Sequence, residues 1–494
     1  MNIKMLIYIL GKVLLIEGIL MILPIVCGIC YGEWSFLTYY VACAAAYIIA
    51  GCLISFKKPK NMTVFIKDGC VATALSWVVL SIGGCVPFML TGEIPSFTDA
   101  MFETASGFST TGASILTNVE AMSHTSLLWR SLTHWIGGMG VLVFLLAVVP
   151  MTGGSNMNLM RAESPGPTVG KIVPKVRSTA KMLYLIYLAM TITEIVVLAI
   201  CGMPLFDSVC SAFGTAGTGG FGVRNDSFAS YAPHIQVIVA VFMIMFGMNF
   251  NFYYYFTTKQ VNKAFKMSEI KVYLAVIATV TAIITFSVLG QYGSFGESLR
   301  HSFFQVATII TTTGFATTDF DLWPTAAKFL LLCLMILGAC ASSTGGGIKV
   351  ARFQIMFKSV KREIQSYIHP KTVKKIHVDG KTVDSEVIHS VALYFFIYLL
   401  IFTGSMFIVS FEGHDLVTLF SSVAATFNNI GPGLSLVGPT QNYSFFSNVS
   451  KWVFIFDMIA GRLELMPLIV FLTPTTYKGI IKKPRKAQSR FISF

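Results

Sequence analysis

Long apolar segments recur along the whole chain and limit its fold more than any other feature. A helix needs about 20 predominantly apolar residues to cross a bilayer. Segments of that kind lie at about 5–31, 36–56, 69–90, 126–150, 180–202, 231–256, 269–290, 326–357, 385–411 and 449–473. Hydrophobic residues make up 54% of the chain and charged residues only 12%, which is about half the charged share of a soluble protein. The sequence therefore predicts an all-α, polytopic membrane protein.

The basic residues fall into short clusters between the apolar segments. The net charge is +13, but no soluble domain with a basic face is visible, which argues against nucleic-acid binding. If the N-terminus is cytoplasmic, most of the 36 Lys and Arg residues lie in inside segments: the N-terminus, 57–67, 152–181, 257–271, 349–384 and the tail. This bias predicts cytoplasmic termini and basic loops that face anionic lipid. The first segment is too long for a signal-peptide core, so we expect a retained span.

Four shorter apolar stretches lie between the spans, at about 97–110, 205–217, 298–312 and 416–429, all on the outer side. A polar loop follows each of them: GFSTTGAS, AGTGGFGV, TTTGFATT and NNIGPGLS. The aligned glycines, Gly112, Gly220, Gly314 and Gly431, recur at about the length of one span–short helix–loop–span unit, which is a repeat signature. We expect four membrane–pore–membrane repeats in a pseudo-fourfold arrangement plus an extra N-terminal pair of transmembrane helices. The predicted boundaries are 1–67, 68–178, 179–267, 268–384 and 385–494.

The chemistry of these loops suits a cation. Irregular backbone survives in a membrane only where it is buried in protein or lines a watery cavity. Four loops that meet on one axis can replace the hydration shell of a cation with carbonyl oxygens, and glycine allows the backbone angles that this requires. The alternative is that each loop is an ordinary turn between interfacial helices. The predicted selectivity filter consists of Thr110, Thr111, Gly112, Thr218, Gly219, Gly220, Thr312, Thr313, Gly314, Asn429, Ile430 and Gly431.

Acidic residues lie near the starts of the short helices: Asp99, Asp207, Glu297 and Asp415. Acids at a helix N-terminus complement the helix dipole, so capping is the simpler interpretation, and attraction of cations is the alternative. The C-terminal, partially negative end of each short helix would point toward the filter, which favours a cation there.

A break rich in small and polar residues, LGACASSTGGGIKV, interrupts the eighth apolar segment. It predicts a flexible gating loop under the filter, and close helix packing through small residues is the alternative. The last span carries Asp457, Arg462 and Glu464 near its middle, and charges at such depth mark functional sites. Arg462 places positive charge at the pore or forms a structural ion pair with Glu464 or Asp457, and the two roles are compatible. The predicted gate consists of Ala339, Ser342, Ser343, Thr344, Gly345, Gly346, Gly347 and Arg462.

Six motifs together resemble the Trk/Ktr/HKT superfamily of potassium transporters, and most closely its bacterial TrkH branch: ASGFSTTGAS, GTGGFG, TTTGFATTD, NNIGPG, SSTGGGIK and GRLELMPL. The resemblance covers essentially the whole chain. It implies K⁺ uptake across a bacterial plasma membrane through one pathway per subunit, with no organic cofactor in this chain. It also implies a gating loop near Ala339 to Gly347 and a pore-facing Arg462. The K⁺ ligands that it implies are Thr111, Gly112, Gly219, Gly220, Thr313, Gly314, Ile430 and Gly431.

The resemblance further implies a homodimer on a cytoplasmic ring of regulatory subunits that bind a nucleotide such as NAD, ATP or ADP. In this superfamily a serine at the first filter position accompanies Na⁺ transport, so Gly112 favours K⁺. The second loop departs from the pattern, because GTGGFG offers either Gly219 or Gly220. Matching its GF to Gly314-Phe315 selects Gly220.

Two other classes of protein compete with a channel-like transporter. A cation carrier coupled to H⁺ or Na⁺ would favour inverted repeats around a mid-membrane site, whereas these four loops repeat in one direction. A membrane-embedded enzyme would need a catalytic motif, and no HExxH, paired carboxylates or Ser/His arrangement is present on the spans. His134, His301 and His389 are isolated, and we expect structural or interfacial roles for them.

Overall fold

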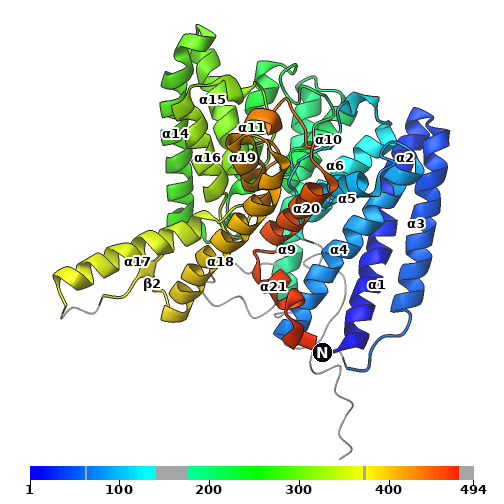
Figure 1. Cartoon of the computed structure of the whole chain (residues 1–494), viewed down its shortest axis with the longest axis horizontal. Coiled ribbons are helices and arrows are strands. Elements are labelled where there is room, and N and C mark those ends of the chain that lie inside the picture. Colours follow the sequence, from blue (N-terminus) through cyan, green and yellow to red (C-terminus); the bar gives the residue numbers. More distant parts are fainter. Residues whose placement is uncertain (62–63, 141–175, 371–373, 478–494) are drawn as a thin grey trace, which may run out of the picture.

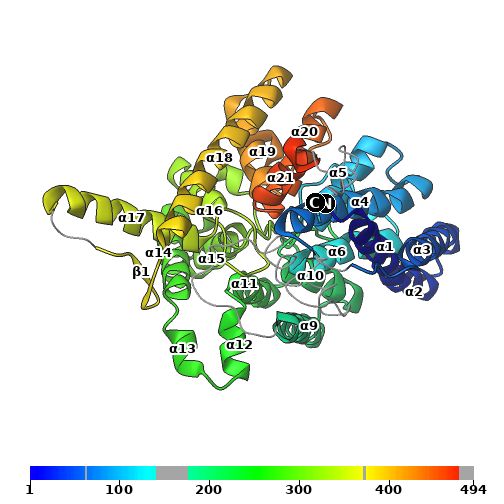
Figure 2. The ribbon, with the colours of Figure 1, turned by 90° about the horizontal axis from the view of Figure 1, so that it is seen from below.

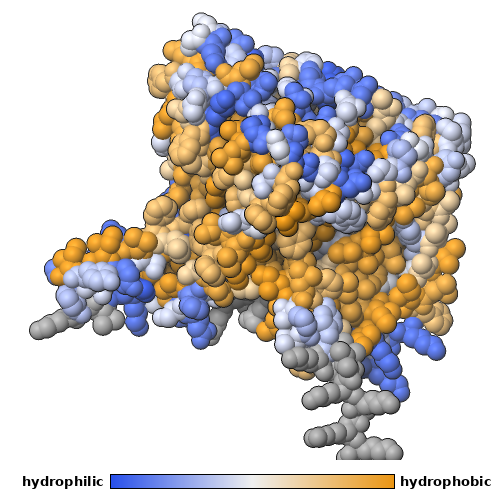
Figure 3. All heavy atoms as spheres, in the orientation of Figure 1, coloured by the Kyte–Doolittle hydropathy of each residue, from blue (hydrophilic) through white to orange (hydrophobic). Residues whose placement is uncertain are grey.

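The computed structural model describes residues 1–61, 64–140, 176–370 and 374–477. This part of the chain is almost entirely helical, and a two-stranded antiparallel hairpin, β1 (His377–Val378) and β2 (Lys381–Thr382), accompanies the helices. The longer helices stand roughly upright in Figure 1 and enclose the shorter ones in the view from below in Figure 2. Apolar side chains form a broad band across the face seen in Figure 3, with polar residues above it and at its lower edge. The predicted all-α membrane fold is confirmed.

The outer frame consists of α1 (Ile3–Leu20), α2 (Ile22–Tyr31), α3 (Trp34–Ser55), α4 (Ile66–Leu90), α6 (His124–Met139), α9 (Val176–Ile200), α11 (Pro233–Gly247), α14 (Ser268–Tyr292), α16 (Thr325–Leu337), α18 (Ser385–Val409) and α20 (Asn448–Arg462). Among the described residues, six helices are long and apolar enough to cross a membrane, or seven if the bent pair α11 and α12 (Asn251–Thr257) is one span. In this count α1 and α2 form a single span, Ile3–Tyr31. The chain is therefore a multi-pass membrane protein.

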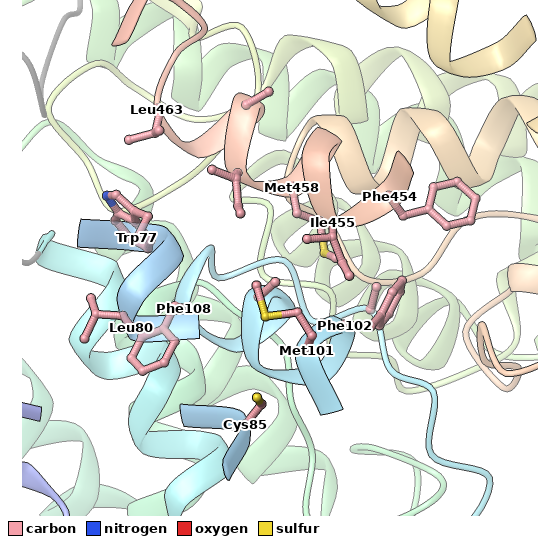
Figure 4. Close-up of a cluster of buried hydrophobic side chains, with 14 of the residues drawn as sticks. Trp77, Leu80, Cys85, Met101, Phe102, Phe108, Phe454, Ile455, Met458 and Leu463 are labelled. Carbon is pink, nitrogen blue, oxygen red and sulfur yellow. The ribbon is translucent and has the colours of Figure 1, made fainter. Parts of the chain in front are cut away.

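Four short helices lie in the upper half of the molecule in Figure 1: α5 (Phe97–Phe108), α10 (Leu205–Gly217), α15 (Phe295–Ile310) and α19 (Leu416–Phe427). Each packs between longer helices; α5, for example, contacts α4, α6 and α20. Figure 4 shows this packing, in which Trp77 and Leu80 of α4, Met101 and Phe108 of α5 and Met458 of α20 gather in one buried cluster. The four short apolar stretches predicted from the sequence are thus short helices inside the protein.

Serine and aspartate side chains begin several of these helices. Ser96 accepts a hydrogen bond from the Asp99 N–H of α5 (3.4 Å), and Asp415 accepts one from the Thr418 N–H of α19 (3.0 Å). Ser123 and Ser447 cap α6 and α20 in the same way. Such caps satisfy N–H groups that the first helical turn leaves without a partner. An unsatisfied N–H group is costly inside a membrane.

Two predicted continuous spans, 231–256 and 449–473, are wrong because the helices break, whereas the break expected within 326–357 is present. The segment 231–256 divides into α11 and α12, which bend by 89°. The segment 326–357 divides into α16 and α17 (Val350–Ile368), separated by residues 338–349, and the segment 449–473 divides into α20 and α21 (Met466–Leu472). Mean hydropathy does not detect these breaks, because they occur at a few glycine and polar residues within apolar sequence. In the segment 126–150, α6 ends at Met139, and residues 141–150 lie outside the described residues.

Short elements complete the described chain: α13 (Val261–Phe265) and the 3₁₀ turns η1 (Val119–Ala121), η2 (Phe320–Leu322), η3 (Ser410–Glu412), η4 (Ser435–Val437) and η5 (Pro474–Tyr477). Helix α17 projects from the body of the molecule in Figures 1 and 2.

Candidate functional site

The four short helices end with the same backbone motif. The residue two positions before each aligned glycine is left-handed: φ is 57° at Thr110, 54° at Thr218, 61° at Thr312 and 57° at Asn429. The N–H of the following residue bonds back by five positions, from Thr111 to Ser106 (2.9 Å), Gly219 to Gly214 (2.8 Å), Thr313 to Thr308 (2.8 Å) and Ile430 to Ala425 (2.8 Å). This is a Schellman ending, which usually places glycine at its left-handed position. A non-glycine residue there is uncommon, so its occurrence at all four ends indicates a specialised backbone.

The four loops that follow these helices meet in a closed ring. A Cβ placed on Gly112 would lie 2.0 Å from the Gly219 carbonyl oxygen, and one on Gly220 would lie 2.0 Å from the Thr313 carbonyl oxygen. A Cβ on Gly314 would lie 3.0 Å from the Gly431 nitrogen, and one on Gly431 would lie 2.7 Å from the Gly112 carbonyl oxygen. Each loop therefore touches the next through backbone atoms, and a side chain at any of the four positions would force neighbouring loops apart.

In the second loop, Gly220 rather than Gly219 matches the other loops. Gly220 has φ 82°, close to the 81° of Gly112 and the 89° of Gly314, and only glycine adopts such angles readily. A Cβ on Gly219 would instead lie 2.2 Å from the His134 ring, behind the loop. Gly431 is not left-handed, so close contact rather than its φ angle accounts for the glycine there.

Most of the loop carbonyls have no hydrogen-bond donor within the described part of the chain. Of the carbonyls of the twelve residues in the predicted filter, only that of Gly431 accepts a hydrogen bond from a described residue, the Tyr443 hydroxyl at 3.1 Å. The surrounding residues are buried; Thr110, Thr111, Thr312 and Thr313 are 0% exposed. Buried carbonyls are nearly always paired, so such a concentration of unpaired carbonyl oxygens indicates a site for cations or ordered water.

Side-chain hydrogen bonds around the ring brace the loops, while the Thr110 hydroxyl and the Asn429 side-chain oxygen are buried without a partner in the described part of the chain. The Thr111 hydroxyl bonds that of Ser109 at 2.7 Å, and the Thr313 hydroxyl bonds that of Thr311 at 2.8 Å. The Asn429 amide donates to the Thr111 hydroxyl (3.0 Å) and to the Met458 carbonyl (2.8 Å), which links the fourth loop to the first.

Only one of the four acids near the helix starts is an N-cap. The hydroxyl and the backbone N–H of Thr418 both donate hydrogen bonds to the Asp415 carboxylate. These bonds hold the pKa of Asp415 below its usual range. Asp99, Asp207 and Glu297 lie in the first turns of α5, α10 and α15. They pair with Lys451 (2.6 Å), Arg224 (3.4 Å) and Arg300 (3.6 Å), respectively. The acids are therefore held by local partners.

The segment between α16 and α17 contacts the underside of two loops. The Gly346 N–H donates to the Thr312 hydroxyl (2.6 Å), and the Gly347 N–H donates to the Asn428 carbonyl (3.0 Å). On the other side, the Thr344 hydroxyl donates to the Phe246 carbonyl (3.2 Å) and the Phe250 N–H donates to the Ser342 carbonyl (3.1 Å). Residues 338–349 thus lie between the third and fourth loops and the broken end of α11.

The remaining residues of the predicted gate belong to this segment. Ala339 is fully buried next to Gly345, Ser343 donates to the Cys340 carbonyl at 2.6 Å, and Ser342 is left-handed with φ 54°. The Ala341 N–H donates to the Glu269 carboxylate at 2.6 Å. The seven residues of the predicted gating loop thus lie in the segment 338–349, and individual hydrogen bonds join this segment to the surrounding helices and loops.

Arg462 joins this segment to another helix end. Its guanidinium donates to the Thr344 carbonyl (2.6 Å) and to the carbonyls of Gly137 (2.5 Å) and Gly138 (2.7 Å) at the end of α6. Among the described residues, Glu464 pairs with Arg352 rather than with Arg462, and Asp457 accepts a hydrogen bond from Ser405 at 2.6 Å. The structural ion pair considered as the alternative for Arg462 is therefore not formed with either acid.

Sequence reasoning missed Glu103 and Arg130, which form a buried ion pair behind the first two loops. Their charge inside apolar sequence was the available signal. It also gave His134 only a structural role; its Nδ1 lies 2.7 Å from the Gly107 carbonyl, and its Nε2 accepts from the Phe221 N–H at 3.2 Å. His301 similarly contacts the Thr317 hydroxyl at 2.9 Å. Both of these histidines support the loops.

Comparisons with known proteins agree with this arrangement. The model of the TrkH family, described as a cation transport protein, matches residues 39–476. The chain is 36% identical over 419 residues to the Trk system potassium uptake protein TrkH of Salmonella typhimurium, covering 83% of this chain and 86% of that protein. It is 31% identical over 484 residues to the protein of the same name from Halomonas elongata, covering 97% and 100%.

A solved structure shares the whole fold. The crystal structure of the potassium transporter TrkH from Vibrio parahaemolyticus superimposes with a TM-score of 0.87 at 30% sequence identity, covering 97% of this chain and 100% of the other. The chain therefore belongs to the TrkH family of cation transport proteins.

Proposed function

We propose that this protein takes up potassium ions across the plasma membrane of a bacterium through a channel-like pore. The ring of loop carbonyls without donors is the observation that carries this proposal. Carbonyl oxygens of that kind can replace the hydration shell of K⁺. The names of the relatives, Trk system potassium uptake proteins, support potassium as the substrate.

In this proposal four membrane–pore–membrane repeats each contribute one loop to the filter. The K⁺ ligands are the carbonyls of the residues around Gly112, Gly220, Gly314 and Gly431. The Schellman endings support this assignment, because a left-handed residue before each glycine reverses the chain at the helix end. The helix C-termini add partial negative charge around the site.

Residues 338–349 form the gate below the filter. Their hydrogen bonds to Thr312, Asn428 and Phe246 support a position on the ion pathway. Arg462 holds the gate closed, because it links Thr344 to the end of α6 by hydrogen bonds and brings a positive charge close to the loops. The segment is held by separate hydrogen bonds to several elements rather than by regular helix or strand pairing, which suits a gate.

The proposal includes a homodimer that binds a cytoplasmic ring of nucleotide-binding regulatory subunits. Helix α17 supports the dimer, because it leaves the body of the molecule with an exposed apolar stripe of Phe357, Val360, Ile364 and Ile368. A contiguous exposed apolar surface of this kind favours a protein partner. Basic residues beside the stripe, including Lys358 and Lys361, fit cytoplasmic termini and anionic lipid at that side.

The test is the substitution Gly314→Ser. A side chain there would meet the Gly431 nitrogen and the Pro432 ring at 3.0 Å, so we expect weaker discrimination of K⁺ from Na⁺ without loss of membrane insertion. Gly293→Ser is the matched control, because Gly293 is also left-handed (φ 65°) but has no atom within 4 Å of its Cβ position. K⁺ and Na⁺ uptake would be measured in transport-deficient cells. Unchanged selectivity in well-expressed Gly314→Ser would disprove the filter assignment.

A further inference from the structure

The most buried ion pair in the described part of the chain lies behind the first two loops. The Arg130 Nε of α6 donates to the Glu103 Oε1 of α5 at 2.6 Å, and the two side chains are 3% and 0% exposed. Removing two charges from water is costly, and their attraction offsets this cost only when further hydrogen bonds satisfy both groups. The other partners of Glu103 and Arg130 therefore indicate what the pair does.

Glu103 holds the chain that follows the first filter glycine. Its Oε2 accepts a hydrogen bond from the Ile115 N–H at 3.0 Å, and its Oε1 accepts one from the Ser114 hydroxyl at 2.9 Å. Ser114 and Ile115 come two and three residues after Gly112. A carboxylate binds backbone N–H groups more strongly than a neutral acceptor does, so this contact fixes the outer end of the first loop.

Arg130 holds the corresponding part of the second loop. Its Nη1 donates to the Gly222 carbonyl at 3.0 Å, and its guanidinium lies 3.5 Å from the centre of the Phe221 ring. Phe221 and Gly222 come one and two residues after Gly220. The planar guanidinium can bond an acid, bond a carbonyl and stack on a ring at the same time, and lysine cannot do all three.

Hydroxyl groups perform the same task in the other two loops. Ser227 accepts from the Ala316 N–H in the third loop at 3.2 Å. Ser421 accepts from the Leu434 N–H and donates to the Leu434 carbonyl in the fourth loop, at 2.9 and 3.1 Å. Every loop is thus held just after its glycine, and within the described part of the chain only the junction of the first and second loops is held by a charged pair.

We infer that Glu103 and Arg130 are positioning residues that set the ion selectivity of the filter by fixing the first loop against the second. The inference rests on the proposed function. The two loops approach so closely that a Cβ on Gly112 would lie 2.0 Å from the Gly219 carbonyl oxygen. The number and spacing of carbonyl ligands determine which cation is preferred, and the charged clamp controls this spacing without contacting the ion.

The experiment compares Glu103→Gln and Arg130→Lys with the wild type, using purified protein in liposomes at matched amounts. Glu17→Gln is the control, because Glu17 is also buried but lies against Gly83 of α4 and has no hydrogen-bond partner among the described residues. We expect both filter variants to conduct K⁺ with a K⁺/Na⁺ flux ratio lowered at least about tenfold, which corresponds to about 1.4 kcal/mol. The control keeps the wild-type ratio.

Two further variants distinguish positioning from general destabilisation. Ser114→Ala removes the hydroxyl that donates to the Glu103 carboxylate and accepts from the Leu116 N–H, but it keeps the ion pair. It therefore lowers the ratio by less than Glu103→Gln does, and it provides the test if the charge variants do not fold. In the double variant Glu103→Gln/Arg130→Gln no unpaired buried charge remains. Its ratio is therefore no lower than that of Glu103→Gln, because the two residues act as one unit.

Wild-type selectivity in folded Arg130→Lys and Ser114→Ala would overturn the inference. The response of Gly314→Ser identifies which proposal has failed. If Gly314→Ser changes selectivity and the clamp variants do not, the filter stands and the positioning role of the pair falls. If none of these variants changes selectivity, the proposed filter itself is wrong.

Discussion

The substitution Gly220→Ala separates the geometry of the ring from ordinary backbone strain. Gly220 has φ 82°, and a Cβ at this position would lie 2.0 Å from the Thr313 carbonyl oxygen. Ordinary contact begins at 3.4 Å, so the second and third loops must separate to admit even one methyl group. The atom that must move is backbone, and no side-chain rotation relieves the overlap.

Gly413→Ala isolates the strain. Gly413 has φ 77° but no atom within 4 Å of its Cβ position, so its substitution adds only the left-handed backbone cost of about 1–2 kcal/mol. Gly220→Ala incurs the same cost and also displaces a carbonyl of the ring. We therefore expect the K⁺/Na⁺ flux ratio, compared per amount of protein in the membrane, to fall at least about tenfold in Gly220→Ala alone, equivalent to about 1.4 kcal/mol.

The assay measures Rb⁺, K⁺ and Na⁺ uptake by cells that lack their own K⁺ transport, normalised to the amount of protein in the membrane. Rb⁺ serves as the tracer for K⁺. Equal selectivity in Gly220→Ala, Gly413→Ala and the wild type would refute the reasoning, because a ring this closely packed cannot admit a methyl group without a change in its ligands.

Three other outcomes follow from the same structure. Shortening residues 341–347 raises K⁺ flux above that of the wild type at equal expression; flux no greater than wild type would count against a gate. Arg462→Gln raises K⁺ flux in liposomes about tenfold, equivalent to about 1.4 kcal/mol, which is no more than the free energy that one charge-assisted hydrogen bond contributes. Reduced flux in this variant would contradict the proposal that Arg462 holds the gate closed. Asp415→Ala lowers the free energy of unfolding by about 1 kcal/mol. Because the pKa of Asp415 is lowered in the folded state, its contribution is present above the unfolded pKa and lost as the pH falls through the folded pKa, which thermal unfolding at several pH values would reveal.

The sequence predicts the short helices and their loops well, because both have local signals. Apolar stretches such as 416–429 are too short to span a membrane, and the glycine motifs recur in a fixed relation to them. The match of Gly220 to Gly112 and Gly314 also has a local cause, since all three need a left-handed backbone. The agreement between loops, rather than any one motif, makes this prediction possible.

Breaks in the long helices and the buried contacts could not be predicted in the same way. The bend between α11 and α12 follows a glycine inside an apolar run, where hydropathy is nearly unchanged. The partners of Arg462 come from segments more than 100 residues away. The sequence suggested Glu464 or Asp457 as partners because they are close along the chain, whereas the fold supplies backbone carbonyls and gives Glu464 to Arg352.

The most direct test of a channel-like potassium pore is ion flux through the purified protein in liposomes, with and without gradients of H⁺ and Na⁺. The four-loop filter predicts K⁺ flux down a K⁺ gradient alone and a clear preference for K⁺ over Na⁺. Flux that occurs only with an H⁺ or Na⁺ gradient would instead indicate a coupled carrier, and equal flux of K⁺ and Na⁺ would contradict a K⁺-selective ring of carbonyls.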